Sequence, residues 1–546
     1  MHKRHHRISW QDKSCGILLI WRMLPAMKRP LTAALALAAA LGTSRADLRL
    51  PSFFTNHAVL QRDQPLRIWG WSSQGETIRV SLGSETSTAT AGPDGRWLAT
   101  LAPQPLSTRP LTLTISSPTE TLSRTDILLG DVWLCSGQSN MDWSLGACKA
   151  PEDVASANFP AIRHFRTEYH FASTPQEDVR GQWQACSPTT AHSFSAAGFY
   201  FARRIQSATG VPIGLITNAV GGTNIELWMS QETLLQTPSL EPYARTMRDS
   251  LAQYQHDLAA ALAPMQSWSN QARAAQSAAT PIPLPPSFPE FPFGEKAHRP
   301  RCTTLHNGHV APLIPMSLRG VLWYQGENNA DASLYLEKKT AMITAWRSWF
   351  QNPEMPFYFV QLAAWQKPNP DPAGGEWGPI RDVQRQCLQI PHTGMACAID
   401  IGDAEDIHPA NKADVGERLA LWALARNYGK ADLAMSGPLF RQLTIEGQTA
   451  RIHFDHTGKG LITATKSGRL PATETPGARL QRFAIAGNDR HWHWADATID
   501  GHTVTVSSPK VPAPVAVRYA FSSNPAGANL YNRAGLPASP FRTDSW

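Results

Sequence analysis

Ser139 and His408 have the side chains that nucleophilic acyl transfer needs, and 269 positions separate them. Ser139 ends the segment Asp131-Val-Trp-Leu-Cys-Ser-Gly-Gln-Ser, in which an apolar strand pattern runs into a glycine-bearing turn. His408 follows the acid-rich segment Asp400-Ile-Gly-Asp-Ala-Glu-Asp-Ile, which itself follows a strand pattern. An imidazole beside a hydroxyl can take the hydroxyl proton as the oxygen attacks an acyl carbon. Taken alone, Ser139 would equally suit a helix N-cap, so other segments must decide.

Three acids shortly before His408 are candidates for orienting its ring. They are Asp403, Glu405 and Asp406. A carboxylate beside a histidine fixes the tautomer and supports the imidazolium that forms during catalysis. The acids lack the spacing and the terminal glutamate of an EF-hand calcium loop. No Cys/His group has zinc spacing, so the sequence predicts no metal site.

Two more polar segments follow strand patterns. In Asn218-Ala-Val-Gly-Gly-Thr-Asn, paired glycines let backbone N–H groups approach a ligand closely. In Leu322-Trp-Tyr-Gln-Gly-Glu-Asn-Asn, amide side chains stand beside aromatic ones. Each has a plainer interpretation, namely a strand-to-helix turn for the first and a polar loop with Trp323 and Tyr324 in the core for the second. Together the four segments supply the nucleophile, base, acid and donors of an acyl-transfer site.

The elements around these segments predict an α/β fold with a parallel sheet and helices on both faces. Apolar runs of strand length alternate with segments of helical period. The expected strands are 127–134, 213–218, 321–324, 357–362 and 395–401, and the expected helices are 194–208, 335–350 and 413–428. Sites of such sheets lie beyond the carboxyl ends of the strands, where we expect the four segments to meet.

The rest of the chain divides around this region. The length of 546 residues predicts two to three domains. Alternating patterns predict accessory β-sandwich regions at 47–125 and 436–546, which form one domain or two. The α/β region is then 126–435, with an insertion at 231–300 that is helical at first and proline-dense later.

The four segments resemble the SGNH (GDSL-like) hydrolase superfamily and, within it, the sialate O-acetylesterase family with its bacterial carbohydrate acetylesterase relatives. The matching residues are Gly137-Gln-Ser-Asn-Met, Gly221-Gly-Thr, Trp323-Tyr-Gln-Gly-Glu-x-Asn, and Asp406-Ile-His-Pro followed by Lys412. The resemblance implies a three-layer fold and a cofactor-free serine esterase that removes acetyl groups from sugar hydroxyls.

The resemblance also implies roles for individual residues. Ser139 corresponds to the nucleophile and His408 to its base. The N–H groups of Ser139 and Gly221 correspond to oxyanion-hole donors, and Gln325 stands near the family's amide donor, although Asn328 competes for that role.

The orienting acid departs from the superfamily pattern. Many members have an aspartate three residues before the histidine, where this chain has Glu405. Asp406 fits the Asp-Ile-His-Pro pattern better and is favoured, while Glu405 and Asp403 stay open.

The substrate class is an acetylated carbohydrate, but the sequence does not choose among sialic acid esters, acetylated xylan and acetylated xyloglucan. Asn328, Trp323 and Trp365 are the candidate substrate contacts. Trp143 and Trp228 are further stacking candidates, although most tryptophans are expected to be structural.

The N-terminus predicts export to the periplasm or the medium. Lys28 and Arg29 precede the apolar stretch 31–42, and Ser44-Arg-Ala offers a cleavage site, with Met27 a better start than Met1. Residues 1–46 hold eight Lys or Arg and one Asp, which leaves 42 basic and 42 acidic residues in the remainder. This balance removes the argument for nucleic-acid or anionic-membrane partners. No apolar run is long enough to span a bilayer.

The sequence also allows two alternative functions, and its cysteines allow disulfides. The β regions and 19 tryptophans would also suit an exported carbohydrate-binding protein without catalysis. Cys135 could serve as a nucleophile, but its place in a strand pattern favours burial. Six cysteines after residue 46 permit disulfides of unknown connectivity.

Overall fold

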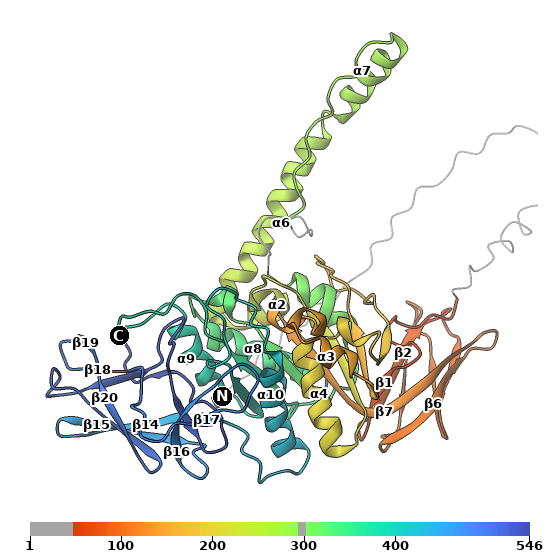
Figure 1. Cartoon of the computed structure of the whole chain (residues 1–546). Helices are drawn as coiled ribbons and strands as arrows, with labels where there is room; N and C mark the ends of the chain where they lie inside the picture. Colours follow the sequence, from red (N-terminus) through yellow and green to blue (C-terminus); the bar gives the residue numbers. More distant parts are fainter. Residues whose placement is uncertain (1–46, 293–301) are drawn as a thin grey trace, which may run out of the picture. The chain divides into compact units, whose positions relative to one another are not determined.

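The computed structural model describes residues 47–292 and 302–546 (Figure 1). The predicted signal region, residues 1–46, and the end of the predicted insertion, residues 293–301, lie outside the described residues.

The centre of the structure is a sheet with the strand order β13-β12-β11-β7-β10-β8-β9. Its strands are β7 (Thr121–Gly137), β8 (Phe159–Arg166), β9 (Trp183–Cys186), β10 (Ile213–Ala219), β11 (Gly320–Tyr324), β12 (Phe357–Gln361) and β13 (Thr393–Cys397). All neighbours on this path pair in parallel except β8 and β9. Every residue of β10, β11 and β12 is buried, so both faces of the sheet are covered and the strands read as continuous apolar runs.

The helices of this region match the periodicity of the sequence. They are α2 (Ser139–Asp142), α3 (Pro151–Ala155), α4 (Ala196–Thr209), α8 (Tyr335–Trp349), α9 (Gly378–Gln386) and α10 (Lys412–Asn427). The Ser195 hydroxyl caps α4 by accepting a bond from the Gly198 N–H, and Gly210 ends the helix in the left-handed conformation. The predicted helices are confirmed to within about two residues at each end. The predicted strand at 395–401 is shorter, because β13 ends at Cys397 and the chain then leaves the sheet as a loop.

Strand β7 connects the central sheet to the N-terminal β region. Its first part pairs with β6 (Ser107–Ser116) and β1 (Val59–Gln61), and its last part pairs with β10 and β11. With β3 (Thr77–Leu82) and β4 (Glu85–Thr90), the described sheet has 11 strands; β2 (Leu66–Trp71) and β5 (Arg96–Leu101) form a separate pair. A boundary near residue 125 therefore falls within one continuous strand, and the division into domains stays a proposal.

Residues 436–546, all described, form further antiparallel sheets. One contains β14 (Leu439–Glu446), β15 (Thr449–Asp455), β21 (Thr503–Ser507) and β20 (Asp496–Asp500). A second sheet contains β17 (Thr473–Glu474), β16 (Leu461–Thr465) and β23 (Leu530–Asn532). A third contains β19 (Trp492–Trp494), β18 (Phe483–Ala486), β22 (Ala516–Tyr519) and β24 (Phe541–Arg542). Ile452, Ile485 and Phe541 belong to a hydrophobic core distinct from that of the central sheet. This region reaches the loop after β13 through the Tyr531 hydroxyl, which donates to Asp400 Oδ2 at 3.1 Å.

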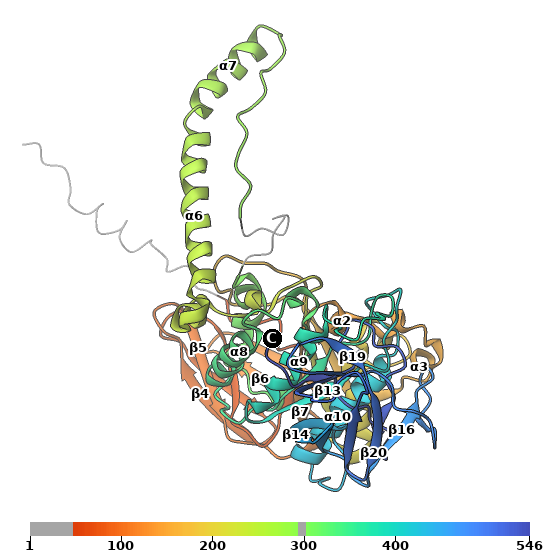
Figure 2. The same cartoon turned by 90° about the vertical axis from the view of Figure 1, so that its left-hand side faces the viewer.

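The insertion begins as helices, as predicted. It contains α5 (Gln231–Gln236), α6 (Glu241–Leu262) and α7 (Met265–Ser277), and residues 279–291 have no regular secondary structure. Helices α6 and α7 extend away from the sheet in both views (Figures 1 and 2). Accordingly, α6 buries only Ala244 and Met247, and α7 buries no residue. Among the helices of the described residues, none combines the length and apolar character needed to cross a bilayer.

Candidate active site

The structure brings Ser139 and His408 together. Ser139 Oγ lies 2.8 Å from His408 Nε2, within hydrogen-bond distance. Ser139 is the first residue of α2 and lies two positions after the last residue of β7, and His408 lies in the loop between β13 and α10. A β-carbon at Gly137, whose φ is 129°, would lie 2.2 Å from the Tyr324 carbonyl oxygen. Only glycine therefore permits the close strand approach that precedes the serine.

The imidazole of His408 is held between an aromatic ring and a carboxylate. The Trp143 ring stacks on it with centroids 4.5 Å apart and planes 9° from parallel. Asp406 Oδ1 lies 3.5 Å from Nδ1 and also accepts a 2.8 Å bond from the His408 backbone N–H. Burial lowers the pKa of His408 and the Lys412 ammonium lowers it further, while Asp406 raises it. The net lowering favours the neutral ring, which is the form that can accept a proton.

Of the three candidate acids, Asp406 is the one that contacts His408. Asp403 Oδ1 accepts the Glu405 backbone N–H at 2.9 Å, which closes a local turn. Neither Asp403 nor Glu405, both within the described residues, has a hydrogen bond or ion pair with His408.

Replacing Asp406 by asparagine is expected to lower kcat about tenfold, because a half-exposed charge pair contributes on the order of 1 kcal/mol. The loss should be far smaller than for any replacement of His408. Steady-state acetate release measures it, with Asp403→Asn as the control that keeps the wild-type rate. A wild-type rate for Asp406→Asn would move the role to Glu405 or Asp403.

Gly221 lies against Ser139. A β-carbon at Gly221 would be 3.3 Å from Ser139 Cβ, tighter than ordinary contact, and Gly222 has a left-handed φ of 69°. The turn after β10 therefore brings its backbone close to Ser139, as the paired glycines predict.

Gln325 is not available as an oxyanion donor, and the prediction of that role is wrong. The side chain is fully buried, and its amide hydrogens are donated to the Thr223 carbonyl at 3.1 Å and to Asn329 Oδ1 at 2.7 Å. Asn328 is exposed and donates to the Gly222 carbonyl at 2.7 Å, so it lies over the glycine turn. Asn328 thus stays a candidate for substrate contact.

Trp323 cannot contact a substrate, and that prediction is also wrong. Its side chain is fully buried, with ring centroids of Trp228 and Trp346 each 6.0 Å away. The plainer interpretation of Trp323 as a core residue is confirmed. Trp365 is half-buried, with its ring 4.9 Å from that of Trp377, and stays a candidate.

A buried polar cluster beneath the pair was not predicted. Asn140 Nδ2 donates to Glu327 Oε1 at 2.6 Å and to the Ile407 carbonyl at 3.0 Å. Lys412 Nζ donates to Asn140 Oδ1 at 2.8 Å and to the Pro409 carbonyl at 2.6 Å. Asn140, Glu327 and Lys412 stand within the segments quoted from the sequence, but nothing in their spacing indicates that they meet.

The cysteines do not offer a competing nucleophile. Cys135 is fully buried in β7, and burial raises the pKa of its thiol, which disfavours the reactive thiolate. The six cysteines of the described residues, which are Cys135, Cys148, Cys186, Cys302, Cys387 and Cys397, are all free.

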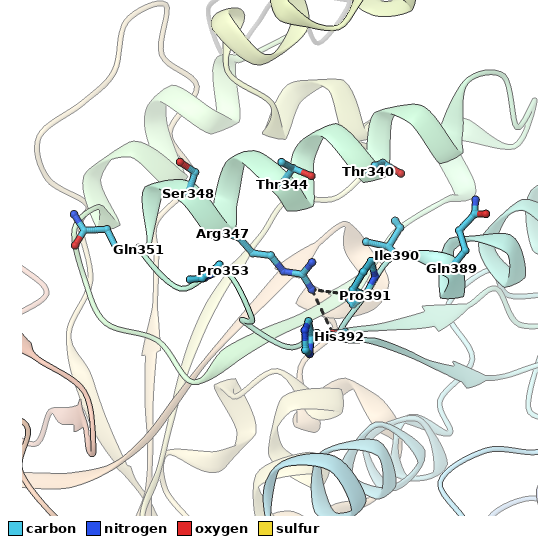
Figure 3. Close-up of a pocket in the computed structure, with 10 residues that line it drawn as sticks. All are labelled: Thr340, Thr344, Arg347, Ser348, Gln351, Pro353, Gln389, Ile390, Pro391 and His392. Carbon is cyan, nitrogen blue, oxygen red and sulfur yellow. Dashed lines mark hydrogen bonds between the residues drawn. The ribbon is translucent and has the colours of Figure 1, made fainter.

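A pocket of about 830 Å³ lies elsewhere, between α8 and the segment before β13 (Figure 3). Arg347 crosses it and donates to the backbone carbonyls of Pro391 and His392. The pocket lies beside the amino ends of β12 and β13, and none of the predicted site residues lines it. Ser139 and His408 instead follow the carboxyl ends of their strands, where sites of parallel sheets lie.

Comparison with known proteins decides the family. The family described as carbohydrate esterase, sialic acid-specific acetylesterase, matches residues 129–278 and 304–425. Sialate O-acetylesterase of Rattus norvegicus is 30% identical over 453 residues, which covers 73% of this chain and 77% of the relative. The chain belongs to the sialic acid-specific acetylesterase family.

Other members of the acetylesterase family match nearly the whole chain. Sialate O-acetylesterase of Mus musculus is 29% identical over 541 residues, covering 90% of this chain and 94% of the relative. The crystal structure of a carbohydrate acetylesterase from Xanthomonas citri has 35% identity and a TM-score of 0.75, covering 92% of this chain and all of that one. The chain is therefore a carboxylic ester hydrolase with a mixed α/β fold and additional β sheets. The alternative of an inactive binding protein is not favoured.

Proposed function

We propose that the chain releases acetate from acetylated sugar hydroxyls by two-step acyl transfer, with Ser139 as nucleophile, His408 as base and Asp406 as its support. The 2.8 Å separation of Ser139 Oγ and His408 Nε2 carries the proposal. It is supported by the position of both residues after the carboxyl ends of parallel strands.

In the first step, the Ser139 oxygen attacks the acetyl carbon while His408 Nε2 takes its proton. The backbone N–H groups of Ser139 and Gly221 donate to the oxyanion, and one such donor is worth about 3 kcal/mol. The carbon–oxygen bond to the sugar then breaks, and the sugar oxygen takes the proton from His408. In the second step, His408 takes a proton from a water that attacks acetyl-Ser139. Acetate leaves as the proton returns to the serine oxygen.

The proposal extends to the architecture around the site. The complete burial of β10, β11 and β12 supports the three-layer arrangement of the SGNH superfamily. We also propose the divisions 47–125, 126–435 and 436–546, and a periplasmic or secreted location that rests on the signal pattern of residues 28–46.

The substrate is an acetylated glycan, with Asn328 and Trp365 as its proposed contacts. Relatives from mammals are named sialate O-acetylesterase, and the Xanthomonas citri structure is named a carbohydrate acetylesterase. Acetylated sialic acid, xylan and xyloglucan all present acetyl esters on sugar hydroxyls, so all three suit the chemistry.

An acetate-release panel over these three substrates tests the proposal. We expect kcat/KM for one class to exceed that for the others, because sugar contacts differ while the ester does not. The Ser139→Ala variant serves as the blank. Hydrolysis of 4-nitrophenyl acetate without acetate release from any glycan would contradict a carbohydrate substrate. Failure to hydrolyse either kind of ester would contradict the esterase mechanism.

A further inference from the structure

We infer that Asn140, Lys412 and Glu327 form a clamp that positions His408 on Ser139; this inference rests on the proposed function. We call these three residues the histidine clamp. They act through the backbone and the electrostatics around His408, so they are positioning residues and do not touch the reacting atoms.

The clamp holds the backbone carbonyls of the two residues that flank His408. The carbonyl of Ile407, just before the histidine, accepts from Asn140 Nδ2 at 3.0 Å. The carbonyl of Pro409, just after it, accepts from Lys412 Nζ at 2.6 Å. Residues 398–411 form neither helix nor strand, so regular backbone pairing does not restrain this loop. The two side-chain bonds therefore restrain the backbone on both sides of the imidazole.

Asn140 connects the base to the nucleophile. It follows Ser139 directly in α2, and its two Nδ2 hydrogens are used by Glu327 Oε1 and the Ile407 carbonyl. Its Oδ1 accepts from Lys412 Nζ. The buried Asn140 amide therefore connects α2, which carries Ser139, to the loop that carries His408. This arrangement also fixes the orientation of the amide, since each of its atoms has a partner of the required type.

Two residues of the clamp, Asn140 and Lys412, are shielded from water, whereas Asp406 is not. Asn140 and Lys412 are 2% and 0% exposed, while the Asp406 side chain is 49% exposed and 3.5 Å from the ring. Hydrogen bonds in a buried network are stronger than those that compete with water. The clamp is therefore the main restraint on His408, and Asp406 is secondary.

The clamp also places charge near the base. Burial lowers the pKa of Lys412 to about 8 and raises the pKa of Glu327, with Asn140 between the two groups. The charged groups that face His408 are Lys412 from the start of α10 and Asp406 from its own loop. The uncharged Ser139 of α2 and Trp143, which follows α2, also face it. The ammonium disfavours a second positive charge, so it helps to keep the imidazole neutral.

The test compares Lys412→Met and Asn140→Ala with the wild type on 4-nitrophenyl acetate. Each variant should lower kcat about 10- to 100-fold, with KM within about twofold, because a misplaced base slows the chemistry without weakening substrate binding. Lys412→Met should also move the acidic limb of the pH profile of kcat/KM to higher pH. The reason is that loss of the cation raises the depressed pKa of His408 toward its ordinary value. Asn140→Ala keeps the cation, so its limb should move less.

Lys339→Met is the matched control. Lys339 is fully buried, its Nζ has no hydrogen-bond partner among the described residues, and it lies over the Phe359 ring rather than the His408 loop. Removing this ammonium should leave the acidic limb where it is in the wild type. An equal movement of the limb in the control would overturn the assignment to Lys412.

The possible outcomes distinguish failure of the histidine clamp from failure of the proposed function. An inactive wild type would contradict the proposed function, whereas an active wild type with unchanged clamp variants would overturn the clamp alone. If Lys412→Met folds and has a lower kcat, but the acidic limb of its kcat/KM profile does not move, then Lys412 has only a structural role. That result would overturn the inference. If Lys412→Met does not fold, Asn140→Ala decides: a folded variant with the kcat loss supports the clamp, and a wild-type kcat overturns it.

Discussion

Replacing Ser139 by alanine is expected to abolish acetate release while leaving the fold intact. The hydroxyl makes its side-chain hydrogen bond with His408, and the residue is only half-buried, so truncation leaves little unpaired polarity. Loss of a nucleophile that acts with a base typically costs about 10⁴- to 10⁶-fold in kcat. Acetate release under single-turnover conditions, together with the thermal unfolding midpoint, measures both parts of this expectation.

Ser136→Ala is the matched control for this experiment. Ser136 stands three residues earlier in β7, is fully buried, and its hydroxyl has no hydrogen-bond partner among the described residues. Removing it should leave activity unchanged and not destabilise the fold, because no hydrogen bond is lost. Retained turnover in Ser139→Ala, measured on protein free of wild type, would refute the assignment of the nucleophile.

Replacing His408 by asparagine should lower kcat about as much as the serine replacement, by roughly 10⁴-fold or more. Without the imidazole, no group takes the Ser139 proton as the oxygen attacks. The double variant Ser139→Ala/His408→Asn should be no slower than the slower single variant, because the two side chains act as a unit. Initial rates on an acetylated glycan over a pH range of 5 to 9 measure the three variants.

His392→Asn is the control for the histidine. His392 is exposed, lines the pocket of Figure 3 and has a left-handed φ of 55°, which asparagine tolerates. This variant should keep the wild-type rate. A large loss in His392→Asn together with activity in His408→Asn would move the reaction to that pocket. Fully additive losses in the double variant would contradict a cooperating pair.

The sequence predicts the secondary-structure elements and the strand ends that carry Ser139 and His408 because both depend on local sequence pattern. Strand and helix periods depend on neighbouring residues, and they locate α4, α8 and α10 to within about two residues. Ser139 lies just after a strand pattern and His408 in the loop that follows another, and parallel strands present their carboxyl ends on one edge. The meeting of these residues thus follows from topology that the sequence already indicates.

The tertiary structure decided which atoms face the site. The strand β11 is buried throughout, so no polar alternation shows where Trp323 points, and it points into the core. Gln325 lost its predicted role because Thr223, which is 102 positions away, takes one of its amide hydrogens. Likewise, Asn140 and Lys412 are 272 positions apart and meet only after folding. Local pattern determines elements and strand ends, whereas hydrogen-bond partners across such separations depend on packing, which the sequence alone did not reveal.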